Sequence, residues 1–411
     1  MKILHLADIH IGMENYGRVD GATGLNTRLL DYLDRFEEAL QIALDEQVDL
    51  VLIAGDIYKN RTPNPTHQRE FARRLRKVLA ANIPVFILVG NHDVSAAAGK
   101  AHSVEIFDTL AIEGVTIASR MQIHRIETPA GLLQIVAVPW ISRQAILTKE
   151  DVRNLPFSEL EAELLRRVAS WLEEVPGKLD PALPAVLTFH GSVANATYGA
   201  ERSVMLGNDL VLPPSFLAQP GIQYVALGHI HRHQALGQHP PTVYSGSIER
   251  IDFSEEVEQK GVVLVELEPG DEYARWRFIG LKARPFVTIK VDLIGSSDPA
   301  ERIAVAIQKR PIADAVVRLL LTASPEQRPH LDENSLRHQL EEAGAHVVAS
   351  IAIEVQRVER TRYSAVTSEL QEGLTARRAL EIYLETSNVA PARRERLLAA
   401  ADLLLKAEQE L

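Results

Sequence analysis

The chain has no cysteine among its 411 residues. This absence excludes disulfide bonds, thiolate metal sites and a cysteine nucleophile, so any metal ion must be bound by His, Asp, Glu or Asn side chains. Long apolar runs are also missing, because none reaches the roughly 20 residues that span a bilayer. The apolar start of the sequence meets a carboxylate at Asp8 and does not resemble a signal peptide. Together these absences predict a cytoplasmic protein with no membrane segment.

The chain has fewer basic than acidic residues. The chain has 44 Lys and Arg residues against 55 Asp and Glu residues, a formal net charge of -11. This balance argues against a simple DNA-coating protein, because polyanion binding rests on positive patches. It does not exclude an enzyme that meets phosphate groups through bound cations. At roughly 150 residues per domain, the length predicts two or three domains.

A repeated pattern occupies about the first 270 residues: short, almost wholly apolar runs that end in polar, chemically capable residues. Such runs predict strands buried on both faces, and here they are Ile3–Ala7, Leu50–Ala54, Val85–Val89, Leu133–Val138, Ala185–Phe189 and Tyr224–Leu227. Helical spacing of apolar residues lies between them, at Asn26–Gln47, His67–Ala81 and Glu159–Val175. This alternation predicts an α/β layered fold. In such folds ligands bind beyond the carboxyl ends of the strands, where the polar residues of these runs fall.

The pattern changes near residue 280, which predicts further domains. Strands are expected at Phe286–Val291, Ala315–Leu321 and Val347–Val355, with helices at Asp298–Lys309 and Glu333–Ala343. We therefore expect a domain over residues 1–280, a small α/β domain over residues 281–360 and a helical tail over residues 361–411. The tail has the pattern of two amphipathic helices split near Pro391. It could dock into a partner groove or pack on its own chain.

Two of the strand ends place metal-capable residues at alternate positions. These are Asp8-Ile9-His10 and Gly228-His229-Ile230-His231. Alternate residues of an extended chain project to the same side, so each pair can face one ion. Asp-x-His alone occurs often by chance.

Three other strand ends add further candidates. Asp56 follows Gly55, and a carboxylate with two oxygens can bridge two cations. Gly90-Asn91-His92-Asp93 offers an amide oxygen for a hard metal, a histidine directed at a reacting phosphate, and a carboxylate to orient an imidazole. His190 follows a further strand and, taken alone, is more often structural than a ligand.

The combination is more specific than any of its parts. Seven ligands of mixed oxygen and nitrogen suit two neighbouring divalent ions, with Asp56 between them. The seven predicted ligands are Asp8, His10, Asp56, Asn91, His190, His229 and His231.

With these motifs the sequence resembles the calcineurin-like metallophosphoesterases, whose pattern is Asp-x-His, Gly-Asp, Gly-Asn-His-Asp, a later His and Gly-His-x-His. Within that superfamily it resembles the SbcD family of nuclease subunits, through the start Lys2–Gly12, the motifs at 89–93 and 226–231, and Tyr244–Ser247. The resemblance implies a four-layer β-sandwich flanked by helices, with a small α/β capping domain that binds DNA and a helical C-terminal tail. It also implies two divalent ions, Mn²⁺ first and Mg²⁺, Fe²⁺ or Zn²⁺ as alternatives.

The resemblance further implies a reaction. Asp8, His10, Asp56 and His231 would bind one ion, and Asp56, Asn91, His190 and His229 the other. Metal-activated water would then hydrolyse a phosphodiester. His92 would stabilise charge or protonate the leaving oxygen, with Asp93 to orient it.

The implied activity is that of a DNA repair and recombination nuclease, acting as a 3′-to-5′ double-strand exonuclease and a single-strand endonuclease. Homodimers and an SbcC-like ATPase of the SMC family are the implied partners, with the tail as the docking element. The chain has no Gly-x-x-x-x-Gly-Lys-Ser/Thr loop, so any ATP dependence would come from that partner. Two alternatives stay open: another phosphatase or phosphodiesterase with the same metal ligands, and a non-catalytic scaffold that binds DNA ends.

The sequence departs from the family pattern at Lys59. Some relatives have a histidine there, three residues after the bridging aspartate, to which a role in exonuclease action is ascribed. Lys59 can contact phosphate or DNA, but its proton chemistry differs from that of histidine.

Overall fold

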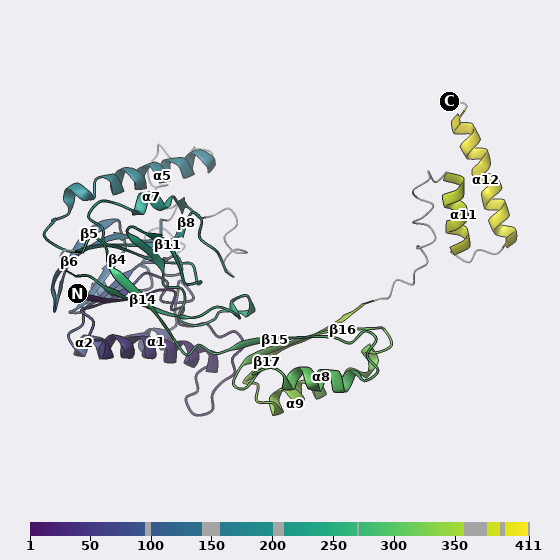
Figure 1. Cartoon of the computed structure of the whole chain (residues 1–411), viewed down its shortest axis with the longest axis horizontal. Coiled ribbons are helices and arrows are strands. Elements are labelled where there is room, and N and C mark those ends of the chain that lie inside the picture. Colours follow the sequence, from purple (N-terminus) through teal and green to yellow (C-terminus); the bar gives the residue numbers. More distant parts are fainter. Residues whose placement is uncertain are drawn as a thin grey trace. The chain divides into compact units, whose positions relative to one another are not determined.

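A computed structural model describes residues 1–94, 100–141, 157–199, 209–268, 271–356, 376–386 and 391–409 (Figure 1). The chain has two compact units. The first comprises Met1–Val291, Asp298–Leu321 and Asp332–Ala352, and the second Asp292–Ser297, Thr322–Leu331 and Ile353–Leu411. The predicted domain boundaries at residues 280 and 360 remain predictions.

One six-stranded sheet contains the first three predicted strands. Its order is β14-β13-β1-β2-β3-β4, with β1 to β4 parallel and β13 and β14 antiparallel to their neighbours. The strands are β1 (Lys2–Leu6), β2 (Leu50–Ile53), β3 (Val85–Leu88), β4 (Val115–Ala118), β13 (Gly261–Glu266) and β14 (Arg275–Gly280). Every residue of β2 and β3 is buried, as expected of parallel strands covered on both faces.

A second six-stranded sheet contains the other three predicted strands. Its order is β11-β12-β10-β7-β6-β5, and β12, β10, β7 and β6 run parallel to one another. The strands are β5 (Gln122–Thr128), β6 (Gly131–Val138), β7 (Ala185–His190), β10 (Tyr224–Gly228), β11 (Gln234–Gln238) and β12 (Pro241–Tyr244). The short strands β8 (Ser192–Val193) and β9 (Val211–Leu212) pair separately.

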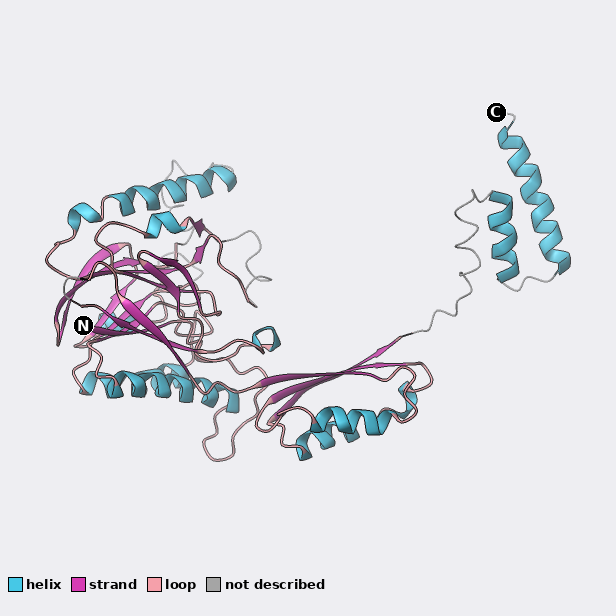
Figure 2. Ribbon diagram, in the orientation of Figure 1, coloured by secondary structure: helices cyan, strands magenta, loops and turns pink. Residues whose placement is uncertain are grey.

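The two sheets pack face to face between two layers of helices (Figure 2). Alternate residues of β1 show this arrangement, since Leu4 and Leu6 belong to the core that contains residues of α1, whereas Ile3 belongs to the core that contains residues of the second sheet such as Val186. The outer helices are α1 (Thr27–Asp45) and α2 (Pro65–Ala80) on the first sheet, and α5 (Phe157–Glu173) and α7 (Pro214–Leu217) on the second. The predicted α/β layered fold is thus confirmed.

Local sequence signals explain where the helices begin. The side chain of Asn26 accepts a hydrogen bond from the backbone N–H of Arg28 at the start of α1. Asn64 caps α2 in the same way, and Pro65 occupies the first helical position, where its missing N–H is not needed.

The predicted small β-α-β-α-β element is also present. Its sheet has the order β15-β16-β17, formed by Phe286–Asp292, Val316–Ala323 and Val347–Val355. Helices α8 (Pro299–Gln308) and α9 (Glu333–Glu342) lie on one face of this sheet (Figure 1). Farther along, α11 (Ala376–Thr386) and α12 (Pro391–Gln409) form a helix pair joined by an ion pair between Arg377 and Asp402, 2.7 Å apart. The second helix of this pair begins at Pro391, where the sequence predicted the split.

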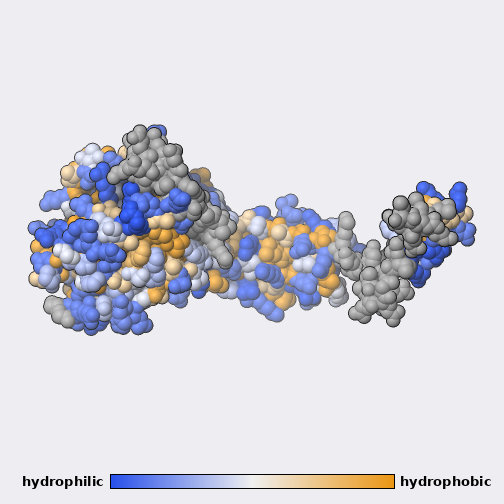
Figure 3. Space-filling view, turned by 90° about the horizontal axis from the view of Figure 1, so that it is seen from above, coloured by the Kyte–Doolittle hydropathy of each residue, from blue (hydrophilic) through white to orange (hydrophobic). Residues whose placement is uncertain are grey.

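The remaining described elements are short. They are α3 (Glu105–Thr109) and the 3₁₀ turns η2 (Pro176–Lys178), η3 (Phe253–Glu255) and η4 (Arg328–His330). Hydrophilic and hydrophobic residues are interspersed on the face shown in Figure 3. In the described part of the chain, no helix is both long and apolar enough to cross a membrane.

His5 is a buried polar link between the two sheets. Its ring nitrogens lie 3.0 Å from the Tyr224 hydroxyl and 3.2 Å from the Leu227 carbonyl oxygen, so Nε2 donates to the carbonyl and Nδ1 accepts from the hydroxyl. Burial lowers the pKa of His5 to about 3. The folded state therefore favours the neutral ring. The resulting contribution to the free energy of unfolding is fully present above the unfolded pKa near 6.5 and is lost as the pH falls toward 3.

We expect His5→Gln to flatten the acid dependence of stability. A proton bound only by the unfolded state makes the free energy of unfolding change with pH by up to about 1.4 kcal/mol per pH unit. The variant should lack this slope between pH 6.5 and 4.5. Urea unfolding with a chelator present measures this slope. His338→Gln, at an exposed position on α9, should keep the wild-type slope. Parallel curves for His5→Gln and wild type would contradict the prediction.

Candidate metal centre

The predicted ligands converge at the carboxyl ends of the strands. Asp8 and His10 follow β1, Asp56 follows β2 and Asn91 follows β3, which are neighbours in the first sheet. In the second sheet, His190 ends β7, and His229 and His231 follow its neighbour β10. All of these residues except Asn91 are buried, and Asn91 is half-buried. The layered fold therefore brings residues from five strand ends to one edge, as the sequence predicted.

Several of these residues have a strained backbone. The φ angles of Asp8, His10, Asp56 and His229 are 52°, 47°, 56° and 101°, a region that side-chain-bearing residues seldom adopt. Backbone hydrogen bonds stabilise the first two: the Asp8 N–H donates to Gly55 O, and the His10 N–H donates to Asp56 O, each at 3.1 Å. Strain of this kind persists only where the surrounding structure enforces it, and it concentrates at functional sites.

The motif glycines leave room for the ligands. A Cβ atom at Gly90 would lie 2.2 Å from Asp56 Oδ1, and one at Gly55 would lie 2.2 Å from His190 Nδ1. Neither position can therefore carry a side chain unless a candidate ligand moves. The glycines of Gly-Asp and Gly-Asn-His-Asp are thus steric requirements of the centre.

Asp8, His10 and His231 form the first group of candidate ligands. The Nε2 atoms of the two histidines lie 3.0 Å apart. The Asp8 carboxylate accepts the backbone N–H of His229 at 2.9 Å, which fixes it beside the second sheet. The Nδ1 atom of His10 is buried and has no hydrogen-bond partner among the residues that the structure describes.

Asp56, His190 and His229 form the second group. Asn91 joins it, because its Oδ1 atom lies 3.0 Å from His190 Nε2 and 3.0 Å from His229 Nδ1. His190 Nδ1 donates to the Ala54 carbonyl oxygen at 2.6 Å, so its Nε2 is the nitrogen that faces the group.

Asp56 lies between the two groups. Its Oδ1 atom is 3.4 Å from His190 Nε2, and its Oδ2 atom is 3.9 Å from His10 Nε2. One oxygen therefore faces each group, which is the geometry required of a bridging carboxylate.

The donor set of the centre fits divalent cations, and its carboxylates and imidazoles shift one another's pKa. Burial raises the pKa of Asp8 to about 7. Burial opposes the charge of Asp56, but His190 keeps the pKa of Asp56 well below its usual value. Burial also opposes protonation of His190, but Asp56 raises the pKa of His190 to about 9. Carboxylate and amide oxygens, together with imidazole nitrogens, suit ions such as Mn²⁺, Fe²⁺ and Zn²⁺. These residues could therefore hold two such ions, with Asp56 shared.

His92 is oriented differently from the expectation. Its Nδ1–H donates to the Lys59 carbonyl oxygen at 2.7 Å, and its backbone N–H donates to Asp56 Oδ1 at 2.8 Å. Nε2 is consequently the nitrogen that can exchange a proton. His92 also offers a nitrogen within 4.8 Å of ligand atoms of His10 and Asp56, so it borders the first group.

Asp93 does not have the predicted role of orienting His92. Its buried carboxylate instead accepts the backbone N–H groups of Asp56 and Gly90, at 3.0 and 3.1 Å, and the Ser103 hydroxyl at 3.1 Å. A carboxylate one residue after the histidine turns away from it and holds together the loops after β2 and β3. Asp93 therefore shapes the backbone under Asp56, and the carbonyl of Lys59 orients His92.

Lys59 thus contributes through its backbone. A carbonyl oxygen is present whichever residue occupies this position, so the orientation of His92 survives the departure from the family pattern. The predicted contact of the Lys59 side chain with phosphate or DNA remains a prediction.

Three further residues border the centre without a motif to announce them. Asp209 Oδ2 lies 3.0 Å from His229 Nε2, and Glu255 Oε1 lies 2.9 Å from His231 Nδ1. Although burial opposes its charge, the Lys260 ammonium keeps the pKa of Glu255 well below its usual range. Trp140, which follows β6, has its ring centroid 5.1 Å from that of His229. Of these three residues, only Trp140 had a sequence signal, because it follows the predicted strand Leu133–Val138.

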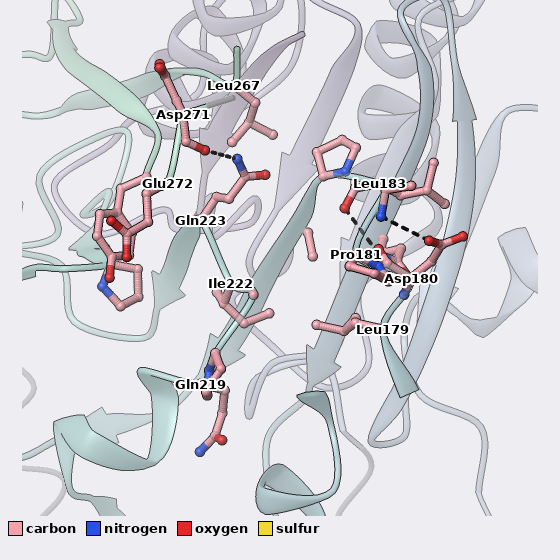
Figure 4. A pocket seen from close by; sticks show the side chains of 18 of the residues that line it. Leu179, Asp180, Pro181, Leu183, Gln219, Ile222, Gln223, Leu267, Asp271 and Glu272 are labelled. Atoms are coloured by element: carbon pink, nitrogen blue, oxygen red, sulfur yellow. Dashed lines mark hydrogen bonds between the residues drawn. The ribbon is translucent and has the colours of Figure 1, made fainter. Parts of the chain in front are cut away.

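A large hollow lies elsewhere, at the amino ends of the strands (Figure 4). Its volume is about 1130 Å³, and its lining includes Met1, Ala185 and Gln223. The Gln223 side chain donates to the Asp271 carbonyl oxygen at 2.9 Å (Figure 4). No predicted ligand lines this hollow, so it is separate from the candidate centre.

Comparison with known proteins finds relatives that are named as a nuclease subunit and as a DNA repair protein. The D component of the nuclease SbcCD from Rhodobacter capsulatus is 29% identical over 330 residues, covering 76% of this chain and 77% of the relative. The component of the same name from Escherichia coli is 26% identical and covers 76% of each chain. "DNA double-strand break repair protein Mre11" of Haloferax volcanii is 27% identical, covering 79% of this chain and 62% of the relative. A solved dimetal phosphatase from Danio rerio covers 68% of this chain and 96% of its own at 11% identity, with a TM-score of 0.38, too low to bear on function.

The family model described as "Calcineurin-like phosphoesterase" matches residues 1–233, more than half of the chain. The matched region ends just after His231 and so contains all seven candidate ligands. The two facing sheets, the helices outside them and the ligands at one edge agree with this match. The chain belongs to the calcineurin-like phosphoesterase family.

Proposed function

We propose that the chain is a metal-dependent DNA nuclease that hydrolyses phosphodiester bonds with two divalent ions, most readily Mn²⁺. One observation carries the phosphodiester chemistry: Asp56 directs one carboxylate oxygen to each of two His-containing groups. When bound, two such ions polarise phosphoryl oxygens and lower the pKa of water. DNA as the substrate is supported by the names of the relatives, which are nucleases and break-repair proteins.

The residues divide this work between them. Asp8, His10, Asp56 and His231 would hold one ion, and Asp56, Asn91, His190 and His229 the other. His92 would present Nε2 to the phosphate and give a proton to the leaving oxygen, held in place by the Lys59 carbonyl. Asp93 would keep the loop beneath Asp56 in shape.

An assay of two substrates tests this function against its main alternative. Linear DNA and p-nitrophenyl phosphate are incubated with the protein and Mn²⁺, with and without a chelator. We expect degradation of DNA that needs Mn²⁺. Cleavage of the monoester with DNA left intact would indicate a phosphatase. A protein that binds DNA ends, takes up no metal and cleaves neither substrate would be a scaffold.

The finer activity follows the SbcD-like relatives in this proposal. We propose 3′-to-5′ exonuclease action on double strands and endonuclease action on single strands, by a cytoplasmic homodimer with an SbcC-like ATPase of the SMC family as partner. The small α/β domain over residues 281–360 would cover the DNA. End-labelled duplexes and circular single strands distinguish the two cleavage modes.

The tail over residues 361–411 is the proposed docking element for the ATPase. We expect a chain ending at Arg360 to lose ATPase binding by at least about tenfold, a loss of about 1.4 kcal/mol, while its own Mn²⁺-dependent cleavage without the ATPase persists. Leu397→Glu is a milder variant, because this α12 side chain is 41% exposed and can change without disturbing a core. Pull-down or calorimetry with the ATPase measures the effect. Full-strength binding by the truncated chain would refute the assignment.

A further inference from the structure

Glu255 is a buried carboxylate whose two oxygens have different partners. Oε1 lies 2.9 Å from His231 Nδ1. Oε2 accepts the Lys260 ammonium at 2.8 Å and the backbone N–H of Ile251 at 2.9 Å. The side chains of Glu255 and Lys260 are both fully buried. A buried ion pair costs desolvation energy, so such a pair beside a candidate metal ligand calls for an explanation beyond stability.

The contact with Glu255 decides which nitrogen of His231 faces the centre. An ionised carboxylate can only accept, so His231 Nδ1 carries the hydrogen. Nε2 is then the nitrogen with a lone pair, and it is the atom that lies 3.0 Å from His10 Nε2 in the first group. A carboxylate behind a ligating imidazole fixes the ring and increases its basicity.

Lys260 fixes the carboxylate and the ligand together. Its ammonium group donates to Glu255, to Glu258 Oε2 at 2.8 Å and to the His231 carbonyl oxygen at 3.1 Å. One buried cation therefore holds both the backbone of His231 and the group that orients its ring. The unit is rigid because all three donors of the ammonium are used.

The segment that carries Glu255 is anchored on the strand β15. The ring of Phe253 lies 4.9 Å from that of Phe286, centroid to centroid. The Glu256 carboxylate accepts the backbone N–H of Thr288 at 3.0 Å. The residues on either side of Glu255 are thus tied to β15, which leaves Glu255 little freedom to move away from His231.

We propose that Glu255, held by Lys260, is a positioning residue for the first metal ion. It acts through His231, by presenting Nε2 to the ion and by increasing the basicity of the ring. The inference rests on the proposed metal centre, and it adds a residue 24 positions beyond the last motif ligand.

Glu255→Gln tests this role, because the amide keeps the size of the side chain and loses its charge. Mn²⁺ binding to the full chain is measured by calorimetry, with the metal alone as probe. We expect wild type to bind two ions. In the variant we expect one ion to bind about 10- to 100-fold more weakly, the usual effect of removing such an outer partner, and the other to bind as in wild type. Loss of a merely structural contact would not selectively lower the affinity for one of two neighbouring ions.

Glu249→Gln is the matched control, because Glu249 is also a buried carboxylate but pairs with Arg28 instead of a candidate ligand. It should bind both ions as wild type does. If Glu255→Gln fails to fold, the double variant E255Q/K260M removes both charges of the pair and should show the same selective loss. Wild-type affinity for both ions in either folded variant, or an equal loss in Glu249→Gln, would overturn the inference. Failure of wild type to bind two ions would instead overturn the metal centre itself.

Discussion

Asp56→Asn should abolish the joint binding of two divalent ions and lower phosphodiester hydrolysis by roughly three orders of magnitude. The carboxylate directs Oδ1 toward His190 and Oδ2 toward His10, so this residue faces both candidate groups. An amide replaces one anionic oxygen with a nitrogen that cannot bind a cation. Metal ions stabilise the charge of the transition state by several kcal/mol. Each 1.36 kcal/mol of that stabilisation is a factor of ten in rate.

Asp49→Asn is the matched control for this change. Asp49 immediately precedes the same strand, β2, and its carboxylate accepts the backbone N–H of Lys2 at the other end of the sheet. It should keep both ions and full activity. Metal content by elemental analysis and the rate of Mn²⁺-dependent DNA cleavage are the two measurements. Two tightly bound ions and an unchanged rate in Asp56→Asn would refute the bridging role.

The sequence predicted the central strands and the placement of their polar ends for one physical reason. A parallel strand covered on both faces must be apolar throughout, and its carboxyl end opens onto the edge where ligands bind. Leu50–Ala54 followed by Gly55-Asp56 shows this in seven residues. Because the chemistry sits directly after the apolar run, fold and site could be predicted together.

The edges of the sheets could not be predicted in the same way. β5 consists of exposed and half-buried residues and pairs only with β6 in its sheet. β13 is a buried apolar run, but its first residue pairs with the far end of β14 and its last with Lys2, 264 positions away in sequence. Antiparallel pairing with a distant strand depends on the assembled sheet. No polar motif follows β13 to mark it.

The site shows a similar division. The seven candidate ligands belong to motifs, so they could be predicted from their residue types. Glu255 and Asp209 contact ligands from segments without any motif, and their role depends on three-dimensional proximity. The orientation of His92 by the Lys59 carbonyl was equally hidden, because every residue has a carbonyl oxygen. Asp93 was assigned to the wrong partner, since adjacency in sequence is a poor guide to side-chain contact in a turn.

His92→Ala should lower the rate of DNA cleavage by about 10² to 10⁴-fold, the usual contribution of a positioned proton donor, while both ions remain bound. The ring is held by its Nδ1–H bond to Lys59 O, which leaves Nε2 to protonate the leaving oxygen. Since the variant keeps its backbone, the N–H of residue 92 can still donate to Asp56 Oδ1 and the bridging carboxylate keeps its place. The expected loss therefore falls on turnover and spares metal affinity.

Because His92 also borders the first group, metal binding decides between a catalytic role and a ligand role. Calorimetry with Mn²⁺ should give two ions of wild-type affinity in His92→Ala, and weakening of the first ion would make His92 a ligand. The leaving group supplies a second criterion. If Nε2 protonates the leaving oxygen, a substrate with an already stable leaving group, such as a nitrophenyl phosphodiester, should lose much less rate than DNA does. His102→Ala, at a half-buried histidine in the same loop region, should leave both rates unchanged. An equal loss on both substrates with full metal occupancy would assign His92 to charge stabilisation in place of proton donation.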